Sequence, residues 1–229
     1  MSQNLLKRLS TSIILLSLLL FINYSHQYIF AISILIVGLI ICLEAKKIFL
    51  KLLKTKFFKK KISTKKFNFN FLILNLITFF YIFFIFCNFS YEIYKFKSPT
   101  FFLYIISICI FTDIGGYVFG KIIGGKKLSK ISPNKTISGS FGSFIFSIIP
   151  LLLFLNFSYL ELEYNSYFII FSLLISLISQ VGDLFISFLK RKAKIKDTGK
   201  ILPGHGGFLD RMDGIIFALP FSYFLLKLF

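Results

Sequence analysis

Residues 69–90 read FNFLILNLITFFYIFFIFCNFS and contain no charged side chain. The hydrocarbon core of a bilayer is about 30 Å thick, and a helix of roughly 20 apolar residues crosses it. A strand with open edges cannot do so, because lipid offers no hydrogen-bond partner to its backbone groups. The stretch therefore predicts a membrane-spanning helix.

Apolar runs of comparable character occur on both sides of this stretch, at 12–24, 27–45, 99–120, 139–157, 166–189 and 213–228. We therefore expect an all-α, polytopic membrane helix bundle with about seven transmembrane helices. The run at 12–24 follows Lys7 and Arg8, as in a signal peptide, but no small-residue cleavage site comes after it. We expect this run to be retained as the first helix of a hairpin.

The composition excludes most other classes of protein. Hydrophobic residues make up 56% of the 229 positions and charged residues only 16%, whereas soluble domains carry about 25% charged residues. The 33 Phe residues exclude a disordered chain. The cysteines Cys42, Cys87 and Cys109 lie singly in apolar runs, so we expect small core residues and not a disulfide framework.

The formal net charge of +18 is explained mainly by topology. Most Lys and Arg residues fall in the segments 7–8, 46–66, 121–135 and 190–211, which share one side of the membrane if the number of spans is odd. Basic loops stay in the cytoplasm, so we expect the N-terminus and these segments on the cytoplasmic face of the cell (inner) membrane. The stretch 46–66 is interpreted as a loop that contacts anionic lipids. Glu44 is interpreted as an interfacial anchor, with a site role as the alternative.

Two acidic residues lie inside predicted spans. Asp113 precedes Lys121, and Asp183 precedes Lys190, by about two helical turns. Both carboxylates are therefore expected at a similar depth below the cytoplasmic boundary. A carboxylate within a span is costly and is a functional candidate by default. We expect these two acids to line one polar cavity, and two buried structural acids are the alternative.

The loop after Asp113 carries donors suited to phosphate. It contains GGKK at 124–127 and SPNKT at 132–136. Backbone N–H, hydroxyl and ammonium groups bind anionic oxygens, although the order of residues in a P-loop is absent. We expect Ser132, Lys135 and Thr136 to contact a substrate phosphate, and an ordinary basic loop is the alternative.

The most polar stretch lies near the carboxyl end and reads QVGDLFISFLKRK at 180–192 and PGHGGFLDRMD at 203–213. Asp210 and Asp213 are spaced i, i+3 at the start of the last predicted helix and share a face. With Asp183 from the preceding span they offer hard oxygen ligands that suit Mg²⁺. The cations that can neutralise phosphates nearby are Lys190, Arg191, Lys196 and Arg211. The stretch predicts a metal-dependent phosphoryl or nucleotidyl transfer site.

The run from 187 to 213 resembles the phosphatidate cytidylyltransferase (CDP-diacylglycerol synthase) family. The positions that carry the resemblance are Ser187, Lys190, Arg191, Lys196, Asp197, Gly199, Pro203, His205, Gly206, Gly207, Asp210, Arg211 and Asp213. The stretch after Asp113 and the SPNKT run are similar to further motifs of that family. The amino-terminal spans match that family only in their apolar character. We therefore expect residues 1–98 to be amino-terminal membrane helices and residues 99–229 to be the catalytic region.

The resemblance implies the reaction of CTP with phosphatidic acid to give CDP-diacylglycerol and pyrophosphate for phospholipid biosynthesis. It implies Mg²⁺, with or without a second cation, held by Asp183, Asp210 and Asp213, with Lys190, Arg191 and Arg211 completing the catalytic group. It implies substrate-binding roles for Asp113, Ser132, Lys135, Thr136, Lys196, Asp197, His205, Gly206 and Gly207. The expected partners are CTP, phosphatidic acid and membrane lipids and not nucleic acid, and assembly as a homodimer stays open.

Three other functions are alternatives to this one. A CDP-alcohol phosphatidyltransferase requires an Asp-Gly-x-x-Ala-Arg motif that is absent. A transporter or flippase for an anionic lipid is expected to show two repeated halves, whereas the polar motifs here crowd the second half of the chain. A lipid kinase that uses ATP stays open, because nothing in the residues themselves specifies cytosine.

Overall fold

The computed structural model of the chain describes residues 3–60, 63–129, 132, 135–156, 167–204 and 206–228. The candidate His205 lies outside these ranges, as do Pro133 and Asn134 of the SPNKT run. The helices, in chain order, are α1 (Gln3–Asn23), α2 (Gln27–Lys60), α3 (Thr64–Phe80), the π-helical segment η1 (Tyr81–Cys87), α4 (Asn88–Phe96), α5 (Pro99–Ile122), α6 (Ile137–Ser147), α7 (Ile149–Asn156), α8 (Tyr167–Lys192), α9 (Leu209–Met212) and α10 (Ile215–Leu228).

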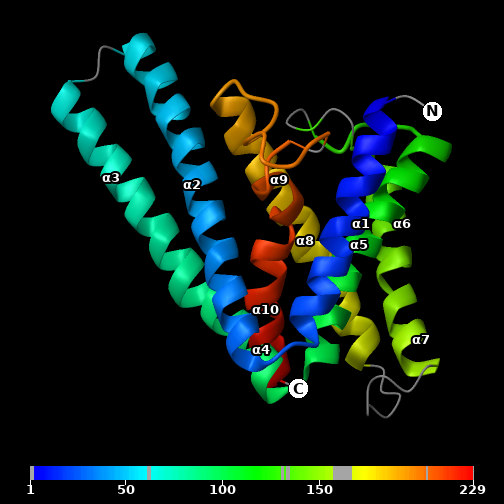
Figure 1. The fold of residues 1–229 in the computed structure, drawn as a ribbon. Coiled ribbons are helices and arrows are strands. Elements are labelled where there is room, and N and C mark those ends of the chain that lie inside the picture. The colour runs from blue at the N-terminus through cyan, green and yellow to red at the C-terminus, as the bar shows by residue number, and fades with distance from the viewer. Residues whose placement is uncertain are drawn as a thin grey trace. The chain divides into compact units, whose positions relative to one another are not determined.

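The prediction of an all-α membrane bundle is confirmed. The described residues form helices and no extended strand, and each predicted apolar run corresponds to helix (Figure 1). Five helical segments of the described chain are long and apolar enough to cross a membrane: Gln27–Thr55, Thr64–Phe96, Pro99–Ile122, Ile137–Asn156 and Tyr167–Lys192. Arg8–Asn23 is a shorter apolar helix, and α10 has 14 residues. The count of about seven spans and the cytoplasmic N-terminus stay predictions.

The chain forms two compact units that each combine distant parts of the sequence. The first unit is Met1–Tyr91 with Leu189–Met212, and the second is Glu92–Phe188 with Asp213–Phe229. The catalytic region predicted at 99–229 thus contributes residues to both units. Its assignment as the catalytic region stays a prediction.

In the first unit, α2 contacts α1, α3, η1 and α9 (Figure 1). Beyond residue 45 one face of α2 carries buried Ile48 and Leu52, whereas Lys47 and Lys51 are exposed. This i, i+3/i+4 spacing is that of an amphipathic helix. The prediction of a loop from residue 46 was therefore wrong, because α2 continues to Lys60.

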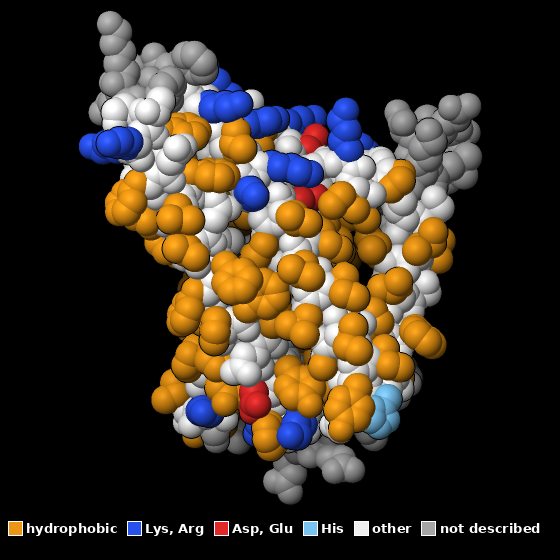
Figure 2. Space-filling model, turned by 60° about the vertical axis from the view of Figure 1, so that its left-hand side comes forward, with side chains coloured by type: hydrophobic (Ala, Val, Ile, Leu, Met, Phe, Trp, Pro, Cys, Tyr) orange, Lys and Arg blue, Asp and Glu red, His pale blue; other side chains and the backbone are white. Residues whose placement is uncertain are grey.

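Many large apolar side chains are exposed on the helices. On α3 and η1 the side chains of Leu72, Leu76, Phe80 and Phe84 are exposed. Figure 2 shows hydrophobic side chains over much of the face that it draws. A soluble domain rarely presents a continuous apolar surface of this kind, so the exposed residues fit a chain whose helices face lipid.

In the second unit, α5 packs closely along α6 because glycines on both helices remove side chains from the contact. A Cβ atom added to Gly139 would lie 2.7 Å from the carbonyl oxygen of Gly116. A Cβ atom on Gly115 would overlap the backbone of Gly142 and lie 2.6 Å from Cβ of Phe146. The glycines on α5 thus serve helix packing, and α5 also contacts α7 and α10.

Candidate active site

The segment between α8 and α9 folds into a compact turn in the first unit. Leu202 and Gly206 exchange backbone hydrogen bonds of 3.0 and 3.1 Å, and Gly204 and Gly206 have φ angles of 76° and 89°. These angles lie in the left-handed region that residues with a Cβ atom seldom adopt. The turn directs the chain back toward α9, which carries Asp210.

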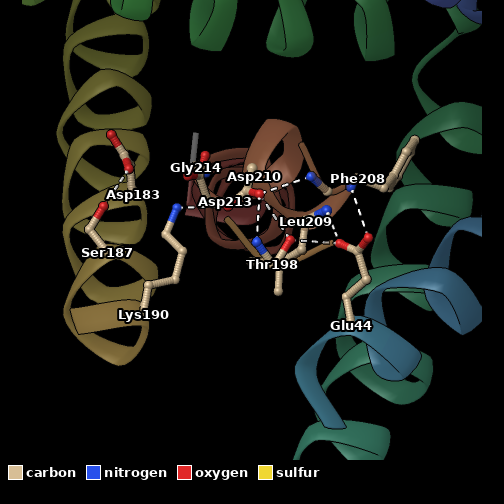
Figure 3. Close-up of polar contacts among 11 residues, drawn as sticks. Glu44, Asp183, Ser187, Lys190, Thr198, Phe208, Leu209, Asp210, Asp213 and Gly214 are labelled. Atoms are coloured by element: carbon tan, nitrogen blue, oxygen red, sulfur yellow. Dashed lines mark hydrogen bonds and ion pairs between the residues drawn. The ribbon is translucent and has the colours of Figure 1, made fainter. Parts of the chain in front are cut away.

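The carboxylate of Asp210 accepts hydrogen bonds from residues of this segment and from Lys190 of α8 (Figure 3). Its Oδ2 atom accepts hydrogen bonds from the backbone N–H groups of Thr198 at 2.8 Å and Gly207 at 3.0 Å, and one from Oγ1 of Thr198 at 3.1 Å. Its Oδ1 atom accepts from Nζ of Lys190 at 2.7 Å. We call Lys190, Thr198, Gly207, Asp210 and the nearby Glu44 the Asp210 cluster.

The surroundings keep Asp210 ionised. Burial by itself would raise the pKa of this carboxyl, but the hydrogen bonds from Lys190 and Thr198 outweigh burial and lower the pKa from its ordinary value of 3.8. The Asp210 side chain is 8% exposed and the Lys190 side chain 12%. Because both partners are largely withdrawn from solvent, the pair is a defined part of the site and not a loose surface ion pair.

Glu44 enters the same cluster from α2. It is fully buried, with an exposed fraction of 0%, and its Oε2 atom accepts from Oγ1 of Thr198 at 2.8 Å and from the N–H group of Leu209 at 2.8 Å. Its Oε1 atom accepts from the N–H group of Phe208 at 3.2 Å. Glu44 is thus an acceptor for the amino-terminal end of α9, and the interpretation as an interfacial anchor was wrong.

Two glycines of the motif leave room for these acceptors. A Cβ atom on Gly207 would overlap Oγ1 of Thr198 and lie 2.6 Å from Oε2 of Glu44. A Cβ atom on Gly199 would overlap Oε1 of Glu44. The two glycines are therefore required by the space that the Glu44 carboxylate and the Thr198 hydroxyl occupy.

A second acidic group lies in the second unit. Asp183 on α8 forms an ion pair with Nζ of Lys135 through its Oδ2 atom, and its Oδ1 atom accepts from Oγ of Ser187 at 3.2 Å. Lys135 precedes α6, whose first turn is capped by the Thr136 hydroxyl accepting from the Gly139 N–H group at 3.1 Å. The structure therefore brings together the predicted residues Lys135 and Asp183, although they are far apart in the sequence.

Asp213 belongs to the second unit as well, directly after α9. Its Oδ1 atom accepts from the N–H group of Gly214 at 3.0 Å. A Cβ atom on Gly182 would lie 2.9 Å from the carbonyl oxygen of Asp213, so the two backbone segments are in close contact. Asp183 and Asp213 thus stand on neighbouring segments of one unit.

The other predicted residues have less defined surroundings. The exposed ones are Asp113, Arg191, Lys196, Asp197 and Arg211, and Ser132 and Gly206 are partly buried. The backbone N–H of Ser132 donates to Oγ of Ser129 at 3.2 Å. The expected cavity shared by Asp113 and Asp183 stays a prediction.

The donor chemistry of the predicted metal ligands fits Mg²⁺, because Asp183, Asp210 and Asp213 offer only carboxylate oxygens. Among the described residues no group of three or more His, Cys, Asp or Glu side chains is assembled for a metal ion. Asp210 belongs to the first unit and the other two acids to the second. The three-carboxylate site therefore stays a prediction.

Sequence reasoning gave Glu44 a site role only as the alternative, and it assigned no role to Thr198. The signal for Glu44 was its spacing, since it lies at i+3 from Ile41 and at i−4 from Ile48, which are both buried. An acid on the buried face of an amphipathic helix needs hydrogen-bond donors from another element. Thr198 could have been noted as the hydroxyl residue between the pattern positions Asp197 and Gly199.

Comparison with known proteins gives a consistent result. A family model described as "Cytidylyltransferase family" matches residues 6–229. The chain is 44% identical over 130 residues to the phosphatidate cytidylyltransferase of Bacillus subtilis (strain 168), covering 55% of this chain and 48% of that protein. It is 45% identical over 126 residues to the protein of that name from Staphylococcus aureus (strain COL), covering 54% and 48%. The match thus spans about half the length of these curated relatives.

Proposed function

Because the chain belongs to the cytidylyltransferase family, we propose that it transfers the cytidylyl group of CTP to phosphatidic acid. The products are CDP-diacylglycerol and pyrophosphate, and the reaction serves phospholipid biosynthesis. The observation that carries the proposal is the Asp210 cluster. In that cluster Lys190, Thr198, Gly207 and Asp210, which are separated in the motif, are joined by hydrogen bonds around one ionised carboxylate.

The reaction needs no nucleophile from the protein. An oxygen of the phosphatidic acid phosphate attacks the α-phosphorus of CTP, and the bond from that phosphorus to the β-phosphate oxygen breaks. Both substrates are anionic, so their approach must be assisted by positive charge, and positioning supplies much of the remaining rate. Lys135 and Lys190 are cations held beside motif carboxylates, which supports this assignment.

We assign Mg²⁺ to Asp183, Asp210 and Asp213. When bound, the ion neutralises phosphate charge and polarises the reacting phosphoryl group. Two of the three acids are paired with a lysine, Asp183 with Lys135 and Asp210 with Lys190. Each pair carries no net charge, and on opening it releases an ammonium group for a phosphate and a carboxylate for a cation.

We propose that the site faces the cytoplasm of the cell membrane. The support is the distribution of Lys and Arg, which is concentrated in the segments predicted to lie on one side. A soluble nucleotide and a lipid phosphate can meet at that boundary. Arg191, Lys196 and Arg211 are exposed residues of the motif, and we assign them to substrate phosphates.

The test is an assay of purified protein in detergent micelles with phosphatidic acid, Mg²⁺ and each nucleoside triphosphate in turn. We expect CDP-diacylglycerol from CTP, no lipid product from ATP, and no product with Asp210→Asn. Phosphorylated lipid from ATP would support a lipid kinase in place of the cytidylyltransferase. A folded protein that forms no CDP-lipid from CTP would refute the proposal.

A further inference from the structure

We propose that Glu44, which lies outside the recognised motifs, is a positioning residue that holds Thr198 and the start of α9 so that Asp210 keeps its working geometry. The structural part of this inference stands on contacts within the first unit. Its effect on turnover rests on the proposed function. Through Glu44, α2 then contributes to the active site and is not only a membrane helix.

The burial of Glu44 requires the contacts that it makes. An acid removed from solvent is stable only when its oxygens receive hydrogen bonds. The donors are the N–H groups of Phe208 and Leu209 and the hydroxyl of Thr198. No Lys or Arg forms a salt bridge with Glu44 in the described part of the chain. The carboxylate and the segment 198–209 therefore depend on each other.

Thr198 links the two acids of the cluster. Its Oγ1 atom lies 2.8 Å from Oε2 of Glu44 and 3.1 Å from Oδ2 of Asp210. A hydroxyl carries one proton and donates one hydrogen bond at a time. The shorter contact favours donation to Glu44, and Oδ2 of Asp210 then relies on the N–H groups of Thr198 and Gly207. Glu44 thus influences which donors Asp210 receives.

The glycines of the motif provide independent support. Gly199 and Gly207 have no side chain at the points where a Cβ atom would meet the Glu44 carboxylate. Neither glycine needs a left-handed backbone, since the described residues with positive φ are Lys194, Gly124, Gly125, Gly204 and Gly206. Space for Glu44 and Thr198 is therefore the physical reason for these two glycines.

The experiment compares full-length Glu44→Gln and Ile48→Ala in detergent. Gln keeps the shape of Glu44 but turns an NH₂ group toward backbone N–H or hydroxyl donors. Ile48 is 1% exposed one turn along the same helix, so its truncation loosens the packing of α2 but leaves the hydrogen bonds of Glu44 to Thr198, Phe208 and Leu209 in place. For Glu44→Gln we expect kcat to fall by about tenfold or more, with a much smaller change in KM for CTP. For Ile48→Ala we expect a lower melting temperature and kcat close to that of the wild type.

Hydrogen exchange gives a measurement that does not need activity. In Glu44→Gln the amides of Phe208 and Leu209 should exchange faster than in the wild type, whereas Ile48→Ala should leave them protected. If the wild type forms no CDP-lipid, the proposed function fails, and the exchange result still decides the structural role of Glu44.

Variants of Thr198 test the same inference if Glu44→Gln does not fold. Thr198→Val removes the shared hydroxyl, and Thr198→Ser restores it. We expect the serine variant to be more active than the valine variant. In the double variant Glu44→Gln/Thr198→Val the loss of activity should be smaller than the sum of the two single losses, because each change disrupts the same hydrogen bond between Thr198 and Glu44. Wild-type kcat and unchanged amide exchange in folded Glu44→Gln, or equal activity of Thr198→Val and Thr198→Ser, would overturn the inference.

Discussion

The Nζ atom of Lys190, near the end of α8, lies 2.7 Å from Oδ1 of Asp210 in α9. The other carboxylate oxygen of Asp210 accepts two backbone N–H groups and lies 3.1 Å from the Thr198 hydroxyl. Lys190 therefore pairs with a different carboxylate oxygen from the one that accepts the N–H groups of Thr198 and Gly207. If this oxygen serves a cation during turnover, Lys190 is also the ammonium group released toward a phosphate.

Removal of the Lys190 charge tests this pair. In Lys190→Met we expect Asp210 to lose its strongest donor, with a destabilisation of about 1.5–3 kcal/mol for a hydrogen bond to a charged group and a fall in kcat. Lys200→Met is the matched control, because Lys200 is an exposed lysine of the segment between α8 and α9. Urea unfolding and steady-state kinetics measure the two effects. Equal stability and activity of the two variants would show that the ion pair has no role.

Low pH should destabilise the folded protein partly through protonation of Asp210. The pKa of this carboxyl is lowered in the folded chain from 3.8, so its contribution to stability is complete above that pH and is lost as the pH falls through the lower folded value. Thermal unfolding in detergent should therefore depend less on pH below 3.8 in Asp210→Asn than in the wild type. Parallel curves for both proteins would contradict the assignment of an ionised, hydrogen-bonded Asp210.

Gly207→Ala tests whether the space beside Glu44 and Thr198 is needed. In Gly207→Ala the added methyl group would overlap the Thr198 hydroxyl, and we expect a cost of about 1–3 kcal/mol from overpacking together with loss of most activity. Gly124→Ala is the control, since no atom lies within 4 Å of its added Cβ, although its φ is +64°. It should cost only about 1–2 kcal/mol of backbone strain. A fully active Gly207→Ala would show that the space is not needed.

Metal dependence tests the carboxylates of the second unit. We expect EDTA to abolish turnover and added Mg²⁺ to restore it. In Asp183→Asn and Asp213→Asn the Mg²⁺ concentration for half-maximal activity should rise by about tenfold or more. Glu92→Gln, an acid outside the motifs, should keep the wild-type Mg²⁺ dependence. Unchanged Mg²⁺ dependence in both aspartate variants would remove them from the metal site.

The fold was predicted well where local sequence determines it. Apolar runs long enough to cross a bilayer corresponded to helices such as α5 and α8, because each helix satisfies its own backbone in lipid. The prediction of a loop from residue 46 was wrong because it followed the many lysines there. The regular spacing of Ile48 and Leu52 instead indicates that the helix continues. Both features belong to one amphipathic helix.

The candidate site was predictable only within its motifs. Lys190 and Asp210 were identified from their spacing, and the structure joins them. For Glu44 a site role was only the alternative, and its partners were not identified, because its contacts to Thr198 and Leu209 span separations of 154 and 165 residues. Local periodicity shows that a residue faces inward, but not which distant segment it meets.

The most direct test of the proposed reaction follows the phosphorus atoms of CTP. Purified protein is incubated with phosphatidic acid, Mg²⁺ and CTP labelled with ³²P at either the α or the γ position, and the lipid and aqueous products are separated. Cytidylyl transfer predicts that the α label enters the lipid and the γ label is released as pyrophosphate. Transfer of the γ label into the lipid, or no labelled lipid from α-labelled CTP with folded protein, would contradict the account.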